Sequence, residues 1–469
     1  MNIHPTVKEI TAIFNQAGKQ VFLVGGAVRD LLQGRKAKDW DLATDARPEE
    51  VMSLFKRKTS LDGQKVKSFV IPTGIKHGTV TVHYKDLNME VTTFRSEGGY
   101  SDGRRPDTVE FGVSIDTDLS RRDFTMNAAA YQLPAGPLID PLCGRDDIKK
   151  HLIRCVGNPV ERFAEDGLRP LRALRFASQL DFTVDPETLN AIPGALALTS
   201  KIAPERVREE LDKIIASSKP STALRLMEQT GLLGLLIPEL TACRSVMQDR
   251  SKAQGRGQGF HQFDVLDHSL LACDFASQEG APIEVRLAAL FHDLGKPLCM
   301  RIDEFGFRTF YRHEHESVRL ARGILCRFRY PNAVVEKVCH LVGEHMFHYE
   351  ESWTDSAVRR FIIRAGEENL PNLYALRRAD SYAQAKNDPP PLLLLPLIKR
   401  VEKILTEKNA LSIKDLAVSG KDLLSAGIPA GKQMGIILNE LLEAVLEDPA
   451  LNTQENLLEI AVKINRERY

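Results

Sequence analysis

The stretch "LVGGAVRDLLQGRKAKDWDLAT", residues 23–44, runs from an apolar strand end through two glycines to a pair of aspartates that flank a tryptophan. Side chains at i and i+2 share one face of a strand, so Asp39 and Asp41 are expected to point one way while Trp40 packs into the core. Two carboxylates on one face repel each other unless a cation lies between them, and hard oxygen ligands suit the Mg²⁺ that accompanies nucleotide phosphates. The pattern predicts a metal-binding cleft, although an isolated pair of this kind is also common as plain surface charge.

The two glycines before this pair allow backbone N–H groups to approach a phosphate closely. Arg29 is placed to pair with that phosphate and Asp30 to orient it, but a strand–Gly–Gly–helix turn without a ligand has the same pattern. Together the two features resemble the GGxVRD and DxD motif of the class II tRNA nucleotidyltransferase and bacterial poly(A) polymerase family. The resemblance implies that Asp39 and Asp41 are a catalytic pair that holds two Mg²⁺ ions. It also implies that Gly26 and Arg29 contact the nucleotide.

A second motif and a third carboxylate extend this site. The string "RRDFTMNAAAY", residues 121–131, resembles the family's second motif, in which arginines, here Arg121 and Arg122, contact the triphosphate and the Asp and Asn brace the site. The run "TVTVHYKDLNMEVTTF", residues 79–94, alternates on either side of a Lys-Asp turn and predicts a hairpin. On it, Glu90 is a candidate third catalytic carboxylate or an ordinary exposed strand residue.

A nucleotide-template motif follows in "EDGLRPLRALRFASQLDF", residues 165–182, which resembles the family's EDxxR pattern. There, Asp and Arg side chains hydrogen-bond the Watson–Crick edge of the incoming base, which suits the exocyclic amine that cytosine and adenine share. The resemblance implies that Asp166 and Arg169 select the base, and that Arg172 and Arg175 lie nearby for phosphate or base. The proline in the motif fits best if the helix starts at about residue 169, which leaves Asp166 in the preceding turn.

Three other segments resemble parts of the same family. The Gly-rich, polar stretch at residues 96–109 predicts a mobile loop, and a loop at this place in the family is associated with A addition, which argues against an enzyme that adds only C residues. The helical "APERVREEL", residues 203–211, resembles the neck segment and is expected to be structural and to face RNA. Residues 415–448 resemble the closing segment, whose Gly-rich turn contacts an RNA backbone or is only a packing turn.

The second half carries histidines and aspartates in the order H…HD…D. They are His268 in "VLDHSL", His292 and Asp293 in "AALFHDLGKP", and Asp380 in "RRADSYA". Imidazole and carboxylate ligands on separate helices can converge on a transition metal, whereas a lone helical histidine is more often a packed or exposed residue. The ordered set resembles the HD-type metal-dependent phosphohydrolases, and in particular the HD region inside some bacterial tRNA nucleotidyltransferases.

The HD resemblance adds two ligands and one departure. His313 in "FYRHEHES" and His345 in "GEHM" match the two further histidines of the pattern, while His261 and His315 are left as supporting or structural residues. The implied cofactor is Mn²⁺, Ni²⁺, Fe²⁺ or a similar ion that makes hydroxide for phosphoester hydrolysis. Arg312 stands where the HD family usually has glycine, which is expected to narrow or recharge the pocket and leaves its substrate open.

The composition is that of an ordinary globular protein. The chain has 469 residues, 43% hydrophobic and 27% charged, and no window approaches the length of apolar sequence that crosses a membrane. The start lacks a basic stretch followed by an apolar core, and the seven cysteines form no CxxC pair, so we expect a soluble cytoplasmic protein with reduced thiols. The formal net charge is zero, which leaves nucleic-acid binding to local arginine clusters.

The pattern along the chain predicts an α+β protein with a small mixed sheet up to about residue 150 and all-α regions after it. Breaks are expected at the Gly-rich residues 249–262 and at the prolines of 387–396. With the resemblances, four regions result. They are a nucleotidyltransferase head (1–148), a nucleotide-selecting and RNA-binding neck (149–245), an HD phosphohydrolase domain (246–395) and a helical RNA-binding tail (396–469).

The function implied by the resemblance is template-independent addition of CCA to tRNA from CTP and ATP. Enzymes that add only A, and poly(A) polymerases, share the same motifs and remain alternatives. An alternative from another class is an HD phosphatase or phosphodiesterase whose head only binds RNA. The sequence leaves the HD substrate, its metal and the oligomeric state open.

Overall fold

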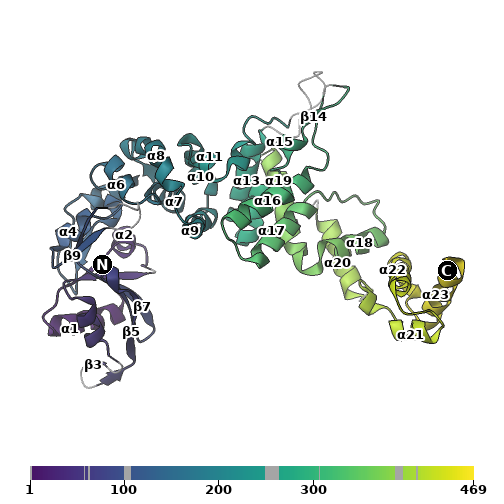
Figure 1. The fold of residues 1–469 in the computed structure, drawn as a ribbon, viewed down its shortest axis with the longest axis horizontal. Coiled ribbons are helices and arrows are strands. Elements are labelled where there is room, and N and C mark those ends of the chain that lie inside the picture. Colours follow the sequence, from purple (N-terminus) through teal and green to yellow (C-terminus); the bar gives the residue numbers. More distant parts are fainter. Residues whose placement is uncertain are drawn as a thin grey trace. The chain divides into compact units, whose positions relative to one another are not determined.

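The computed structural model describes residues 3–37, 39–56, 59–61, 64–99, 107–248, 263–305, 307–385, 394–407 and 410–468. These residues form two compact units, 1–241 and 242–469, which are coloured purple to teal and teal to yellow in Figure 1. Within the described ranges, every helix is too short or too polar to cross a membrane. The seven cysteines all lie in those ranges, and each is a free thiol.

A seven-stranded mixed sheet is the frame of the first unit (Figure 1). The spatial order of its strands is β11 (Leu138–Ile139), β10 (Ala130–Gln132), β1 (Val21–Val24), β2 (Trp40–Thr44), β7 (Leu87–Thr93), β6 (Thr79–Tyr84) and β5 (Ser68–Gly74). Strands β2 and β7 are parallel, and the other neighbours are antiparallel. The predicted hairpin is β6–β7, which turns at Lys85 with a φ of 56°. The predicted α+β fold is therefore confirmed, and the mixed sheet lies at its N-terminal end.

One face of the sheet is buried, whereas the opposite face is buried over β1, β2 and β10 and partly exposed along β6 and β7. Alternation along each strand decides which face a side chain joins. Trp40 and Leu42 of β2 lie in one core with helices α1 (Pro5–Gln16) and α3 (Pro48–Leu54). Ala43 lies in a second core on the opposite face, with Leu119 of helix α4 (Ile115–Ser120). Asp41 shares the face of Ala43, as the alternation predicts. Asp39 differs from the prediction, because β2 begins only at Trp40 and Asp39 is an exposed bend residue before it.

The stretch predicted as a mobile loop begins and ends as strands. Strand β8 (Arg95–Gly98) pairs antiparallel with β9 (Thr108–Phe111), so the prediction of a loop over residues 96–109 was wrong at both ends. The half-exposed two-stranded ribbon carries polar residues on both faces, so its composition resembles that of a loop. Residues 100–106, at the centre of the predicted loop, lie outside the described residues.

Helices complete the first unit. In order they are α2 (Gly26–Leu32), α5 (Gly144–Lys149), α6 (Pro159–Glu165), α7 (Arg169–Leu180), α8 (Pro186–Thr199), α9 (Pro204–Ile215), α10 (Pro220–Gln229), α11 (Leu232–Leu236) and α12 (Pro238–Thr241). A short parallel pair, β12 (Leu152–Ile153) with β13 (Thr183–Val184), interrupts this helical part. Helix α7 begins at Arg169 with Pro170 in its first turn, where the missing N–H of proline has no helical partner to lose.

In the described part of the second unit, the strands form one small hairpin, β14 (Arg301–Ile302) with β15 (Arg308–Thr309), and the other regular elements are helices. Its helices are α13 (Val265–Gln278), α14 (Ile283–Phe291), α15 (Lys296–Cys299), α16 (His313–Arg327), α17 (Asn332–Glu344), α18 (Asp355–Ala365), α19 (Leu370–Ala385), α20 (Leu395–Thr406), α21 (Gly420–Ser425), α22 (Lys432–Glu447) and α23 (Gln454–Arg468). The break predicted at residues 249–262 lies outside the described residues, as do 386–393 between α19 and α20.

A buried ion pair joins α7 to α9. Nε of Arg175 lies 2.5 Å from Oε2 of Glu210, and both side chains are buried. Burial disfavours both charges, but Arg175 lowers the pKa of Glu210 below its usual value. Arg175 therefore depends on Glu210 for compensation, whereas Glu210 also pairs with Lys213 at 3.0 Å.

We expect Glu210→Gln to lower the free energy of unfolding by about 3 kcal/mol, because it leaves Arg175 as a buried charge without a counterion. Urea denaturation at neutral pH measures this loss. Glu209→Gln is the matched control, since the preceding residue on the same helix is exposed and its change should cost little. Equal stability of the two variants would contradict the prediction.

Candidate active site and candidate metal centre

The glycine turn after β1 lies against a carboxylate and a guanidinium. Gly25 has a φ of 67° in the region that favours glycine. A Cβ atom built on it would lie 3.4 Å from Nη1 of Arg122 and 3.5 Å from Oδ2 of Asp41. The turn, the second aspartate of DxD and one arginine of the second motif therefore meet at one point, although they are distant in sequence.

Among the described residues, negative charge outweighs positive charge around Asp41, where Arg122 is the one cation that lowers its pKa. It is the register partner of Glu90 across the parallel pair β2–β7, so the two carboxylates are neighbours on one face. Burial and the charge of Glu90 raise the pKa of Asp41 to about 6; Asp39 adds to the shift, and Arg122 opposes it. A carboxylate that resists ionisation in this way is stabilised by a cation, so these residues fit a divalent metal ion. Glu90, left open by the sequence, is an exposed strand residue that lies beside Asp41 in the register.

A chain of polar contacts links the three motifs of the first unit. Nη1 of Arg29 donates to Oδ1 of Asn127 at 2.9 Å, and Asp30 accepts from the same guanidinium at 2.9 and 3.0 Å. Asn127 donates to Asp123 at 3.4 Å, and Asp123 accepts from Arg172 of α7 at 2.6 Å. The first motif is thus connected through the second to the template helix.

The two arginines of the second motif have different surroundings. Arg121 pairs with Asp118 at 2.7 Å and with Glu97 of β8 at 3.0 Å, whereas Arg122 pairs with Asp118 at 3.3 Å and also reaches Gly25. Although burial opposes ionisation of Asp118, the two guanidinium groups lower its pKa below the usual value. Of the pair, Arg122 is the one that the structure places beside Asp41.

The predicted base-selecting residues are held by Glu165 of their own motif and by partners outside it. Asp166 follows α6 and pairs with Arg206 of α9 at 2.9 Å, across 40 residues of sequence. Arg169 donates to the backbone carbonyl of Arg162 at 2.7 Å and pairs with Glu165. The sequence placed Arg206 in the predicted neck helix but did not indicate its partner. The contact with Asp166 joins segments that are 40 residues apart.

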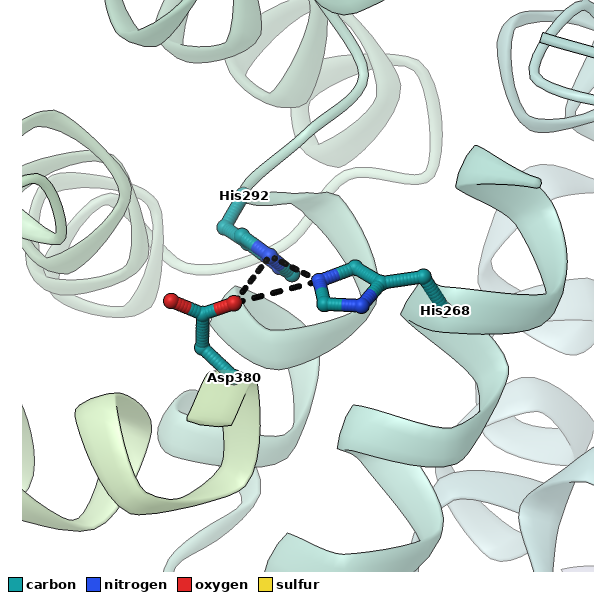
Figure 2. Close-up of side chains that lie close together, drawn as sticks. All are labelled: His268, His292 and Asp380. Carbon is teal, nitrogen blue, oxygen red and sulfur yellow. Dashed lines mark hydrogen bonds and ion pairs between the residues drawn. The ribbon is translucent and has the colours of Figure 1, made fainter. Parts of the chain in front are cut away.

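In the second unit, His268, His292 and Asp380 converge from three helices (Figure 2). Nε2 of His268 lies 3.1 Å from Nε2 of His292 and 3.2 Å from Oδ1 of Asp380, and the distance from His292 to Asp380 is 3.7 Å. All three side chains are buried. They lie close enough to bind one metal ion.

A second group is formed by Asp293, His313 and His345, which are also buried. Oδ1 of Asp293 lies 3.1 Å from Nε2 of His313 and 3.8 Å from Nε2 of His345. Its other oxygen, Oδ2, lies 3.2 Å from His292 and 3.4 Å from His268 of the first group. The structure therefore brings all six predicted HD residues together, with one oxygen of Asp293 facing each group.

The donor atoms of these groups suit metal ions. Nδ1 of three histidines faces a backbone carbonyl, which holds the ring and leaves Nε2 for a ligand; the pairs are His292 with Ala289 (2.8 Å), His313 with Phe310 (2.9 Å) and His345 with Val342 (2.6 Å). Burial and His292 lower the pKa of His345 to about 3, so this imidazole is neutral. Oδ1 of Asp293 is buried, and its 3.1 Å contact with Nε2 of His313 lacks hydrogen-bond geometry, so a bound ion would satisfy this oxygen.

A cavity of about 610 Å³ opens onto both groups. It is lined by Gln248, Asp293, Lys296, Arg308, Thr309, Phe310, Tyr311, Arg312, His313, Glu314, His345, Met346, Arg377, Asp380 and Gln384. Arg312 has a φ of 60°, the left-handed conformation that favours glycine. The glycine expected here by resemblance would therefore fit the backbone, and arginine occupies a strained position.

Comparison with known proteins places the chain in a family. The "Poly A polymerase head domain" model matches residues 21–154, "Probable RNA and SrmB- binding site of polymerase A" matches 181–244, and a tRNA nucleotidyltransferase domain 2 model matches 312–461. The CCA-adding enzyme of Levilactobacillus brevis is 45% identical over 456 residues, which cover 95% of each chain. That of Lactobacillus johnsonii is 33% identical over 97% of this chain and 95% of its own. The chain belongs to the CCA-adding enzyme and poly(A) polymerase family.

A solved structure agrees with this membership along the whole chain. The crystal structure of the Bacillus stearothermophilus CCA-adding enzyme in complex with CTP is 30% identical, with a TM-score of 0.72, and the match covers 99% of both chains. The chain is accordingly a nucleotidyltransferase of this family, and a divalent metal is the cofactor typical of such enzymes.

Replacement of Asp41 by asparagine should separate stability from activity. The folded protein holds the Asp41 proton up to about pH 6, above the ordinary value of 3.8, so wild-type stability falls as pH rises through this window. At pH 7.5 with a metal chelator we expect Asp41→Asn to be more stable than wild type by up to about 3 kcal/mol, and at pH 4 to be equal to it.

Chemical denaturation at the two pH values measures this difference. Asp86→Asn, in the exposed turn of the β6–β7 hairpin, is the matched control and should change stability little at either pH. A gain at pH 7.5 that persists undiminished at pH 4 would show that the charge of Asp41 is not its cause.

Proposed function

We propose that the protein adds the 3′-terminal CCA to tRNA from CTP and ATP without a nucleic-acid template. The observation that carries the proposal is the meeting of Gly25, Asp41 and Arg122 at one point. It occurs in a chain that is similar over nearly its whole length to enzymes named for CCA addition. A CTP complex is known for one of these relatives.

In the head, Asp39 and Asp41 would hold Mg²⁺, and Glu90 is positioned to assist them. When bound, the metal would activate the attacking 3′ hydroxyl and stabilise the leaving pyrophosphate. Asp41 would bind the metal in its ionised form. It must therefore lose the proton that its raised pKa favours. Arg29, which Asp30 and Asn127 orient, and Arg122 would neutralise the nucleotide phosphates beside Gly26.

Base selection falls to Asp166 and Arg169 at the start of α7. A carboxylate accepts from the exocyclic amine of cytosine or adenine, and a guanidinium donates to a ring nitrogen or carbonyl oxygen. The pair between Asp166 and Arg206 supports a fixed orientation for the carboxylate. The half-buried pair of Arg172 with Asp123 and the buried pair of Arg175 with Glu210 support bracing of the helix as the main role of these arginines.

Transfer RNA transcripts that lack one, two or three terminal nucleotides, incubated with CTP alone, ATP alone or both, test this function. We expect two C residues and then one A to be added, whereas an A-adding enzyme or poly(A) polymerase would leave CTP unused. Asp41→Asn should lower the rate at least about 1000-fold, because a neutral amide holds a divalent cation poorly. The exposed Asp86→Asn should retain the wild-type rate. Absence of C incorporation would rule out CCA addition.

We further propose that residues 246–395, between the neck (149–245) and the tail (396–469), form an HD-type phosphohydrolase. The observation that favours it is that Asp293 offers one oxygen to each of two buried ligand groups. Mn²⁺, Ni²⁺ or Fe²⁺, when bound, would supply hydroxide for phosphoester hydrolysis. The histidines would hold such ions through Nε2 while their Nδ1 atoms keep the backbone contacts.

Metal analysis tests the HD proposal independently of turnover. We expect purified wild-type protein to retain a transition metal, and Asp293→Ala to lose it together with at least about 100-fold of any phosphatase rate. CCA addition should continue in this variant. His315→Ala is the matched control, because His315 is a neighbouring histidine whose side chain is 74% exposed. Equal metal content in wild type and Asp293→Ala would overturn the assignment.

A further inference from the structure

Two of the four cations that line the HD cavity are already paired with metal-site carboxylates. Nζ of Lys296 lies 2.6 Å from Oδ2 of Asp293, and Nη1 of Arg377 lies 2.6 Å from Oδ2 of Asp380. The charges of Lys296 and Arg377 are therefore compensated by Asp293 and Asp380 of the two ligand groups. They are in position to contact the first phosphate of a substrate, the one that a bound metal would activate.

The other two cations, Arg308 and Arg312, have no such partner. Among the described residues neither guanidinium forms an ion pair, and both line the same cavity. The acidic residue of the rim, Glu314, lies instead 3.9 Å from Nδ1 of His313 and 3.6 Å from Nε2 of His315. The cavity wall away from the metal groups thus presents two arginines with unused donors, which suits an anion.

Arg312 has a backbone conformation that is strained for a residue with a side chain. Its φ of 60° would suit glycine, and it immediately precedes α16, which begins with the ligand His313. Strain of this kind persists where the surrounding structure requires it and is often found at ligand sites. Arg312 therefore places a positive charge at the cavity wall beside His313. A glycine at this position would remove the backbone strain.

The cavity also offers more than charge. The side chain of Tyr311 is exposed over 79% of its surface and that of Met346 over 58%, and both line the cavity. An exposed ring at a basic rim is a surface on which a base can stack. A volume of about 610 Å³ is in the range of pockets that hold a nucleotide-sized ligand, much larger than a single phosphate.

We propose that Arg308 and Arg312 form a second phosphate subsite, so that the HD pocket takes nucleotides that carry a phosphate group besides the one hydrolysed. This inference rests on the proposed phosphohydrolase function. In the reaction, the oxygen of one water molecule bonds to the first phosphorus and the P–O bond to the leaving group breaks, an ester bond in the 3′,5′-bisphosphate and the anhydride bond in ADP. The leaving oxygen, which belongs to the ribose or to the second phosphate, takes a proton of that water. The second phosphate remains intact on Arg308 and Arg312.

Two sources could supply such a substrate, and two probes distinguish them. Adenosine 3′,5′-bisphosphate has phosphates separated by the ribose, as at the end of an RNA chain, whereas ADP has adjacent phosphates, as in a free nucleotide. Isothermal calorimetry on metal-free, full-length protein compares each probe with 3′-AMP and 5′-AMP, without turnover. We expect one of the two probes to bind at least about ten-fold more tightly than the monophosphates.

The Arg312 variants assign the preference to this cavity, since nucleotides are also expected to bind the head. Arg312→Gly should reduce the preference for two phosphates about ten-fold while relaxing the backbone, and Arg312→Lys should keep part of it. Arg319→Ala, on the exposed side of α16 and 62% exposed, is the matched control and should leave the preference unchanged. An equal preference in wild type and Arg312→Gly would overturn the subsite.

Hydrolysis rates of the metal-loaded enzyme test the phosphate subsite and the phosphohydrolase function separately. If the subsite and the phosphohydrolase function both hold, the Michaelis constant for the preferred probe is lower than that for its monophosphate, and Arg312→Gly removes the difference. If no probe is hydrolysed but the calorimetric preference depends on Arg312, the subsite stands and the phosphohydrolase function fails. A preference that is absent in both measurements contradicts the subsite.

Discussion

A half-buried carboxylate on the face of a sheet is the constraint on which the first unit depends. Trp40 and Leu42 are locked in one core, so Asp41 between them must face the other side of β2. There it lies beside Glu90, and burial with this repulsion raises its pKa to about 6. Arg122 offsets part of the conflict. A bound cation would relieve the rest, so the raised pKa of Asp41 and the metal binding that we propose for it have one origin.

The same electrostatic rule holds the elements behind the site in place. Asp123, Arg172, Glu210 and Arg175 alternate in sign and tie the second motif to α7 and α9. A buried charge that loses its counterion is far more costly than an exposed one, so each member fixes its neighbour. The helix that starts at Arg169 is consequently oriented by ion pairs as well as by apolar contacts.

The second unit also contains a buried carboxylate, but histidines surround it in place of carboxylates and arginine. Asp293 is buried among histidines, and its two oxygens face two ligand groups. Backbone carbonyls at the ends of helical turns hold the rings of His292 and His345, which leaves the Nε2 atoms facing the other side chains of the cluster. At the rim of the cavity, Arg312 stands where the backbone conformation and the HD-family pattern both favour glycine. The rim is therefore the part of the site that departs from the HD-family pattern.

The sequence by itself determined the elements whose signals are local. These are the strand, glycine turn and helix at residues 21–32, the β6–β7 hairpin, and the start of α7 at a proline, because alternation, turn chemistry and helix capping act over a few residues. Tertiary structure alone decided the pairings. Arg29 meets Asn127 across 98 residues and Asp166 meets Arg206 across 40, and no local pattern encodes the partner of a distant charge. The neighbourhood of Asp41 was decided in the same way, because strand order and register, set by packing of the whole sheet, place Glu90 beside it.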